Sequence, residues 1–491
     1  LRLKRERSVP LSSGVTKRVD HYRITYRRDM MTKDDLLNTI CVAALNGLLG
    51  MFVGTGFSKA FSEEGKNYRA YSWKELLTEC CKKLEVDKKI LESQCSYPEL
   101  ATKICEEYAT KKSQDYDTAL NELKKIVGEL TNVSLKDEEC KPYREWFESI
   151  PTNWIITTNY DSIIESVVGN RAFPISNNEC FIKLKSMIPI FHIHGSCTIP
   201  EGIVISYEDY IRMFRPDDYR QARLPMLIKE SCVLMIGYGL GDPNVITAMD
   251  WAKNVYKTTA RYRIELPTIQ LLYTKGEKSK ENPYTSRTGL VIYEIDSIKS
   301  FFSDLYACMK KCKSSHSLKI DSINERMNVA FGAKKSEIIE FGENQKYRDN
   351  WISFFGELEP WYWYADYGFF HLVVAAIKEQ KELSAQSGKF SAYANILKII
   401  LDIFQHISLN RIRNNVFEEL VEGLVCAGFR IDPKGQHVRG YAYEATDIWS
   451  ERKNDIPKDV IARIDTMIKG KIEYDYNAMI LNKLLRSRSK E

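Results

Sequence analysis

From about residue 35 to residue 300 the sequence alternates short apolar runs with longer helical patterns, and this alternation constrains the fold more than any other feature. The apolar runs have the length of buried strands, and each is followed by a turn or a helical stretch. Strands separated by helices in this way form a parallel sheet that is covered on both faces. We therefore predict a Rossmann-like α/β domain, with strands at residues 48–53, 154–157, 188–193, 232–236, 268–273 and 290–295.

After about residue 312 the alternation ends and helical spacing begins. Residues 390–407 and 416–425 repeat apolar side chains on one helical face, as in a packed helical domain. The aromatic-rich residues 351–370 either build the core of that domain or form a surface for a partner. We expect three regions: a basic N-terminal extension at residues 1–30, an α/β domain at residues 31–312, and an all-helical C-terminal domain at residues 313–491.

The positive charge of the chain is concentrated at its N-terminus. The net charge is +5, while residues 1–29 carry nine Lys or Arg against three Asp or Glu. The body of the chain therefore gives no electrostatic reason to expect direct nucleic-acid binding. The N-terminal stretch is either an upstream extension or a flexible basic arm. No apolar run is long enough to span a membrane and no secretory segment is evident, so we expect a cytoplasmic protein.

A glycine-rich turn follows the first predicted strand. Glycines at such a turn let backbone amides approach a phosphate, and the helix that follows favours negative charge there. The turn lacks a full Gly-x-Gly-x-x-Gly pattern, so an ordinary strand-to-helix turn is an equal alternative. The residues of this turn are Gly54, Thr55, Gly56, Phe57 and Ser58.

Polar residues follow the second predicted strand, at the end where open α/β sheets bind ligands. Asn159 could orient a ribose or a water through its amide, and Asp161 could accept a hydrogen bond from a ribose hydroxyl. The alternative is structural, because Asp161 or Ser162 could instead cap the next helix.

Two histidines close the third strand. His192 and His194 alternate along the strand and so point to the same face. A metal site is disfavoured, because no companion ligand lies nearby in the sequence. We expect His194, which precedes Gly195, to face the cleft as a general base, while His192 could equally be a packed, hydrogen-bonded neighbour.

A second glycine-rich turn follows the fourth strand. Gly237, Gly239 and Gly241 would allow a ligand to approach the backbone closely, and Asp242 stands near the start of the next helix. Asp242 followed by Pro243 is also an ordinary helix start, and the two interpretations are compatible.

These four segments, in this order, resemble the sirtuin (silent information regulator) family, and in particular its bacterial branch in antiphage defence systems. The family pattern is Gly-Ala-Gly-x-Ser, then Thr-Gln-Asn-x-Asp, then His-Gly, then a glycine-rich turn. Residues 54–58 match the first segment with Thr for Ala, and residues 158–161 match the second with Thr for Gln. His194-Gly195 matches the third, and residues 205–210 and 237–244 look like the defence branch.

The resemblance implies an NAD-binding sheet and a role for each matching residue. Asn159 would hold the nicotinamide ribose or the attacking water, His194 would act as the base on a ribose hydroxyl, and Asp161 would assist on the nicotinamide side. Residues 54–58 would hold the pyrophosphate. The cofactor would also lie near the second glycine turn, at Gly237, Gly239 and Asp242.

One departure from the family bears on the reaction. Sirtuin deacylases carry a structural zinc held by two Cys-x-x-Cys pairs after the His-Gly motif. None of the twelve cysteines here forms such a pair, and only Cys197 and Cys232 lie between Gly195 and Gly237. We therefore expect reduced thiols, no zinc, and no effect of chelators on activity or melting temperature. A missing zinc lobe favours water, rather than an acyl-lysine, as the acceptor.

The resulting hypothesis is a gated NAD⁺ glycohydrolase that depletes NAD in abortive infection. The alternatives are an NAD-dependent protein deacylase or ADP-ribosyl transferase, and a non-catalytic nucleotide-sensing scaffold. Because an NAD-destroying enzyme needs a switch, which oligomer geometry can provide, we also expect a homo-oligomer. Members of the branch occur with a HerA-like hexameric ATPase, with an Argonaute-type protein, or alone, and the sequence does not choose among these partners.

Overall fold

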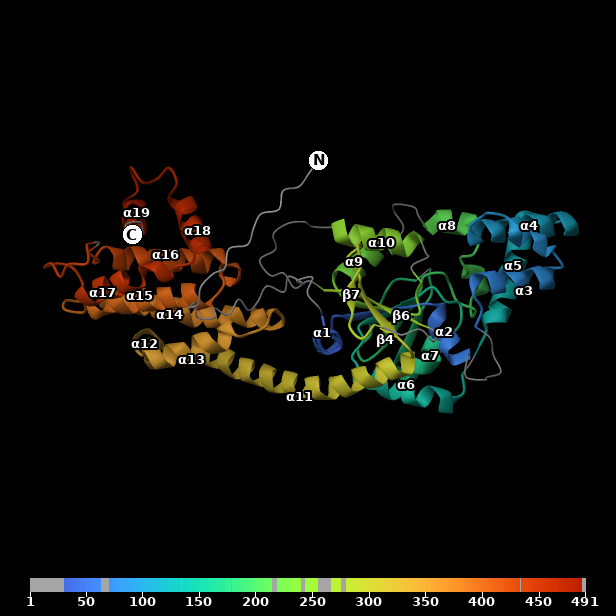
Figure 1. The fold of residues 1–491 in the computed structure, drawn as a ribbon, viewed down its shortest axis with the longest axis horizontal. Coiled ribbons are helices and arrows are strands. Elements are labelled where there is room, and N and C mark those ends of the chain that lie inside the picture. Colours follow the sequence, from blue (N-terminus) through green and yellow to red (C-terminus); the bar gives the residue numbers. More distant parts are fainter. Residues whose placement is uncertain are drawn as a thin grey trace, which may run out of the picture.

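The fold is an α/β domain followed by a helical region, as predicted (Figure 1). The computed structural model describes residues 31–62, 70–133, 135–177, 179–213, 219–239, 243–254, 266–274, 280–432 and 434–487. The predicted N-terminal extension lies outside these described residues.

The described residues form one eight-stranded sheet in the order β3-β4-β2-β1-β5-β6-β8-β7. Every neighbouring pair is parallel except β7–β8. The predicted strands correspond to β1 (Leu49–Val53), β2 (Trp154–Thr157), β4 (Ile188–His192), β5 (Cys232–Ile236), β6 (Thr268–Tyr273) and β8 (Val291–Ile295). The two edge strands, β3 (Ala172–Ile175) and β7 (Tyr284–Thr285), were not predicted from the sequence, and both are short and only partly buried.

Alternate residues of each central strand enter two different cores, as the two-residue period of a strand requires. In β1, Met51 and Val53 pack on the face covered by α1, α2, α6, α7 and α11, whereas Phe52 packs on the face covered by α9 and α10. The helices of the first face are α1 (Lys33–Leu45), α2 (Thr55–Ser62), α6 (Asp137–Ser149), α7 (Ile163–Val168) and α11 (Ile298–Phe331). Those of the second face are α9 (Tyr219–Lys229) and α10 (Pro243–Asn254).

A separate helical lobe is inserted between α2 and α6. It consists of α3 (Trp73–Leu84), α4 (Tyr97–Lys112) and α5 (Tyr116–Thr131), with its own buried core. A buried ion pair joins the lobe to the short helix α8 (Tyr207–Met213), with Lys124 Nζ 3.1 Å from Asp209 Oδ1. The same carboxyl group accepts the backbone amides of Ile205 and Ser206. The lobe is thereby held beside the carboxyl ends of the strands (Figure 1).

Helix α11 leaves the α/β domain and continues into the helical region (Figure 1). Its first half packs in the core of the sheet through Leu305 and Met309, and its second half enters the C-terminal core through Ile323 and Ala330. Residue 312, the expected domain boundary, therefore lies inside a continuous helix. The division into domains at that residue stays a prediction.

The rest of the described chain is helical. Its elements are α12 (Lys335–Glu343), α13 (Gln345–Gly356), α14 (Asp366–Ser384), α15 (Ser391–His406), α16 (Asn414–Gly428), α17 (Tyr443–Arg452), α18 (Lys458–Ile468) and α19 (Tyr476–Arg486). Most of the aromatic-rich segment is core, since Trp351, Phe355, Trp363 and Phe369 are buried there. Among the described helices, none is long and apolar enough to cross a membrane.

Candidate active site

The four predicted segments come together because they follow four adjacent strands. The strands β4, β2, β1 and β5 are parallel neighbours, so their carboxyl ends lie along one edge of the sheet. The chain passes from β1 to strands on one side and later returns to β5 on the other. The crevice between β1 and β5 is thus the switch point at which open α/β sheets bind ligands.

At this switch point the two glycine-rich turns pack directly against each other. The amides of Gly54 and Gly56 donate to the carbonyls of Ile236 and Gly237, each at 2.9 Å, and Phe57 N donates to Gly54 O. A Cβ on Gly237 would lie 2.1 Å from Phe57 N, and Gly237 has a φ of +60°. These three amides are therefore engaged within the protein. The contact of this turn with a pyrophosphate stays a prediction.

Substitution at Gly237 tests how much the site depends on this contact. We expect Gly237→Ala to destabilise the protein by at least ~1–2 kcal/mol, because the left-handed backbone disfavours a side chain and the added methyl group clashes with the first turn. Gly239→Ala is the matched control: nothing lies within 4 Å of its Cβ position, so we expect a change below ~0.5 kcal/mol. Chemical denaturation measures both. Equal stability of the two variants would show that the contact of the turns is dispensable.

A hydrogen-bonded chain joins the first turn to the residues that follow β2. Asn159 Nδ2 donates to Ser58 Oγ at 3.0 Å, and Ser58 Oγ lies 3.0 Å from both carboxylate oxygens of Asp161. Thr55 Oγ1 donates to Asn159 Oδ1 at 3.4 Å. The backbone amide of Asn159 is held by Thr157 Oγ1. Hydrogen bonds therefore fix both Oδ1 and Nδ2 of Asn159. Ser58 of the glycine turn contacts both Asn159 and Asp161 and so holds their positions.

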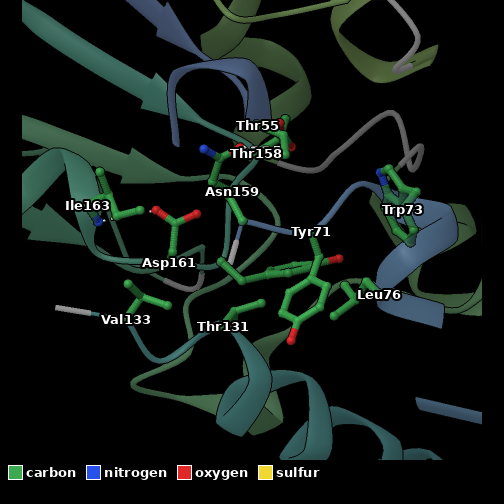
Figure 2. A pocket seen from close by; sticks show the side chains of 12 residues that line it. Thr55, Tyr71, Trp73, Leu76, Thr131, Val133, Thr158, Asn159, Asp161 and Ile163 are labelled. Atoms are coloured by element: carbon green, nitrogen blue, oxygen red, sulfur yellow. Dashed lines mark hydrogen bonds between the residues drawn. The ribbon is translucent and has the colours of Figure 1, made fainter. Parts of the chain in front are cut away.

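A small cavity opens beside this chain of hydrogen bonds. Asn159, Asp161 and Thr55 form its polar side. Tyr71, just before α3, and Trp73, the first residue of α3, face them (Figure 2). Leu76, Thr131 and Val133 complete this wall, and none of the wall residues was predicted from the sequence. The cavity is small, about 50 Å³, with a polar face opposite an aromatic wall.

Two opposing effects act on the pKa of Asp161. Burial raises the pKa of Asp161 to about 6, and the nearby Glu165 carboxylate acts in the same direction. Hydrogen bonds from Ile163 N and Ser58 Oγ oppose that rise. Asp161 also accepts the backbone amide of Ile163 at the start of α7. The predicted structural role at the helix start is therefore compatible with a role in the site. Active sites commonly contain a carboxyl group that lines a cavity and has a perturbed pKa.

His192 is a packed, hydrogen-bonded residue. Its Nδ1 lies 3.0 Å from Asn159 O, and its Nε2 contacts Glu165 Oε1. Burial alone would lower the pKa of His192, but the Glu165 carboxylate raises it, and the net shift is upward. The pair locks the loop that carries Asn159 to the end of β4.

His194 lies at the predicted strand end but is not exposed. Its side chain is 2% exposed, so the expectation that it is open to the cleft is wrong. The ring packs edge-on against Tyr210 at a centroid distance of 5.3 Å, and His194 O accepts Val204 N at 2.8 Å. Tyr210 shares a small core with Trp73, which lines the cavity. His194 therefore lies one layer behind the aromatic wall.

A larger cavity of about 530 Å³ lies on the other side of the first glycine turn. Gly56, Lys59, Gly237 and Gly239 line it on the β1–β5 side, and the ends of β6 and β8 line the rest. Its volume suits a nucleotide-sized ligand. Asp242, the last of the predicted cofactor residues, lies outside the described residues.

Comparison with known proteins agrees with the geometry. Residues 153–290 match the family model of the SIR2-like domain. This stretch contains Asn159, Asp161, His194 and Gly237, whereas the Gly54 turn precedes it. The curated protein Defense-associated sirtuin 2 of Bacillus subtilis is 22% identical over 211 residues, which cover 42% of this chain. The match covers 20% of that relative's length. The predicted resemblance to the sirtuin-like family is confirmed, and the family model covers residues 153–290 of the α/β domain.

Proposed function

We propose that this chain, whose α/β domain is sirtuin-like, is an NAD⁺ glycohydrolase that releases nicotinamide and ADP-ribose. The single observation that carries the proposal is the joining of Asn159, Ser58 and Asp161 in one hydrogen-bonded unit on a cavity at the sheet's switch point. The SIR2-like match and the defence-associated relative support an NAD-related role in defence.

The two cavities meet at the first glycine turn, which supports the proposal that a dinucleotide binds across it. Thr55 lines the small cavity, and its neighbour Gly56 lines the large one. An extended ligand that crosses this turn would set its nicotinamide end beside Asn159 and Asp161 and its adenosine end in the larger cavity. Lys59, at the edge of the larger cavity, carries a positive charge that would favour the pyrophosphate, although it also pairs with Glu75.

The reaction makes modest demands on the protein. Nicotinamide leaves the cationic substrate as a neutral molecule, so the C1′–N bond can break without an acid. Water then adds to the oxocarbenium-like C1′, and one proton is released to a base. The enzyme must orient the ribose, stabilise the developing charge and admit one water. Asn159 is fixed for the first task, and Asp161 supplies a carboxyl group for the second. His194 lines neither cavity, so as the proposed base it would act only in a ligand-bound state that opens the wall between its ring and the small cavity.

The direct test is nicotinamide release by the full chain from NAD⁺ alone. We expect release of nicotinamide and ADP-ribose without any acyl-peptide. Release that requires an acyl-peptide would identify a deacylase, and transfer of ADP-ribose to protein would identify a transferase. Calorimetry that detects no NAD⁺ binding would overturn the proposal and leave the scaffold alternative.

The raised pKa of Asp161 predicts opposite pH trends for activity and stability. Nicotinamide release should fall as pH drops through about 6, because the carboxylate is then protonated. The contribution of Asp161 to stability should rise over the same interval. The folded protein binds this proton more tightly than the unfolded chain, whose Asp pKa is about 3.9. Asp161→Asn should lose both pH trends. Rate profiles and melting curves from pH 4 to 8 measure the two trends. A pH–rate profile of Asp161→Asn that equals that of the wild type would exclude Asp161 from the reaction.

We also propose that residues 313–491 serve assembly and control rather than chemistry. The candidate site residues all precede residue 245, and an NADase needs a gate, for which oligomer geometry is a suitable device. Full-length protein should therefore be a homo-oligomer by light scattering. A monomer at micromolar concentration, alone and with a co-encoded defence protein, would contradict this. A cut at residue 312 is a poor probe, because it would divide α11.

A further inference from the structure

Three cysteine side chains meet between α1 and α11, away from the candidate active site. Cys41 lies on α1, and Cys308 and Cys312 lie one turn apart on α11. Their sulfur atoms all lie within 4.8 Å of one another, and no other such group of His, Cys, Asp or Glu occurs among the described residues. We propose that Cys41, Cys308 and Cys312 together bind a thiophilic metal ion through three thiolates.

The spacing of the sulfurs fits such an ion. Cys308 Sγ and Cys312 Sγ are 3.8 Å apart. Two sulfurs that each lie ~2.3 Å from a tetrahedral zinc are about 3.8 Å from each other, and a trigonal site gives about 4.0 Å. The i and i+4 positions on α11 place both thiols on one helical face. Cys41 approaches that face from α1, with its Sγ 3.8 Å from Leu305 O.

The cluster also has an open side through which a metal could enter. Cys41 is fully buried, whereas Cys308 and Cys312 are half-buried and Asn38 is exposed. Both half-buried thiols lie near Asn38 Oδ1, at 3.3 and 3.4 Å. An oxygen atom at this position, from the amide or from a water that replaces it, is suited to be a fourth ligand. Thiolate ligands select zinc or copper(I) over hard cations such as Mg²⁺.

The position of the cluster gives the proposed metal a structural role. It joins α1, which packs on the sheet, to α11 just before that helix leaves for the C-terminal core. The two helices are also joined by an ion pair, in which Lys33 Nζ lies 2.7 Å from Asp304 Oδ2. A metal that binds only the folded state should raise the melting temperature. This inference does not depend on the NAD⁺ proposal, and it replaces the expectation that no zinc is bound.

Cobalt(II) titration of the reduced, metal-free full chain tests the proposal. We expect one cobalt ion per chain, with thiolate-to-cobalt charge-transfer absorption and the visible bands of a tetrahedral site. Zinc or copper(I) should then displace cobalt, and the stronger competitor identifies the preferred ion. Failure of both to displace it, or the absence of charge-transfer absorption, would overturn the proposal. Melting temperature with and without zinc gives a readout that is independent of enzyme activity.

Serine variants locate the binding. Cys308→Ser and Cys312→Ser should each lose charge-transfer intensity and weaken metal binding by more than the roughly 10–100-fold that loss of an outer-shell partner causes. Cys426→Ser is the matched control, because this cysteine is also half-buried but lies on α16, and it should bind as the wild type does. Cys41→Ser tests the buried ligand. If Cys41→Ser unfolds, the variants at the two half-buried positions, 308 and 312, still test the proposal. Unchanged binding in the double variant at 308 and 312 would refute the site.

Discussion

Replacement of His194 by alanine should abolish nicotinamide release, with a loss of roughly 100-fold or more. His194 follows β4, the direct neighbour of the strand that presents Asn159. It is the remaining candidate base, since the ring of His192 is bonded on both sides. Because His194 is buried against Tyr210, alanine would also leave a cavity. His194→Gln, which keeps most of the volume but accepts no proton, should show the same loss of activity with a smaller loss of stability.

His192 provides the matched control for this experiment. It is as deeply buried as His194, at 2% exposure, and lies two residues earlier. His192→Ala removes the partner of the Glu165 carboxylate, so it should lower the melting temperature more than His194→Gln does, with a milder effect on turnover. Steady-state rates and melting curves of the three variants separate the two roles. A folded His194→Gln protein with wild-type turnover would rule out His194 as the base.

Replacement of Asn159 by alanine should reduce turnover by about 100-fold while NAD⁺ affinity changes far less. The side chain of Asn159 is held by Thr55 and Ser58, so it can orient the ribose at little entropic cost when the reaction occurs. Most of the binding energy would come from the larger cavity, which Asn159 does not line. Calorimetry gives the affinity, and a nicotinamide assay gives the rate.

Asn177→Ala is the control for that variant. Asn177 has the same 7% exposure as Asn159 and donates to Gly202 O at 2.7 Å, but it lines neither cavity. Both variants lose a buried amide, so they should lose comparable stability, and only Asn159→Ala should lose turnover. Equal losses of rate and affinity at position 159 would make Asn159 a binding residue instead.

The strands and the order of the site segments could be predicted from the sequence because their signals are local. An apolar run such as residues 232–236 followed by Gly237 indicates a buried strand and a turn wherever the segment lies. Parallel neighbours then place their following turns along one edge. The edge strand β3 was missed because it is only partly buried and contains Pro174, which weakens the pattern of a strand.

The sequence by itself thus determined the α/β class, the helical C-terminal region and the positions of Asn159, Asp161 and His194 at strand ends. Only the tertiary structure decided what surrounds them. Trp73 reaches the cavity because a helical lobe packs beside the sheet, and His194 is buried by Tyr210 from another element. Cys41 meets Cys308 across a separation of more than 260 residues. Such contacts depend on how whole helices pack, and no local spacing in the chain encodes them.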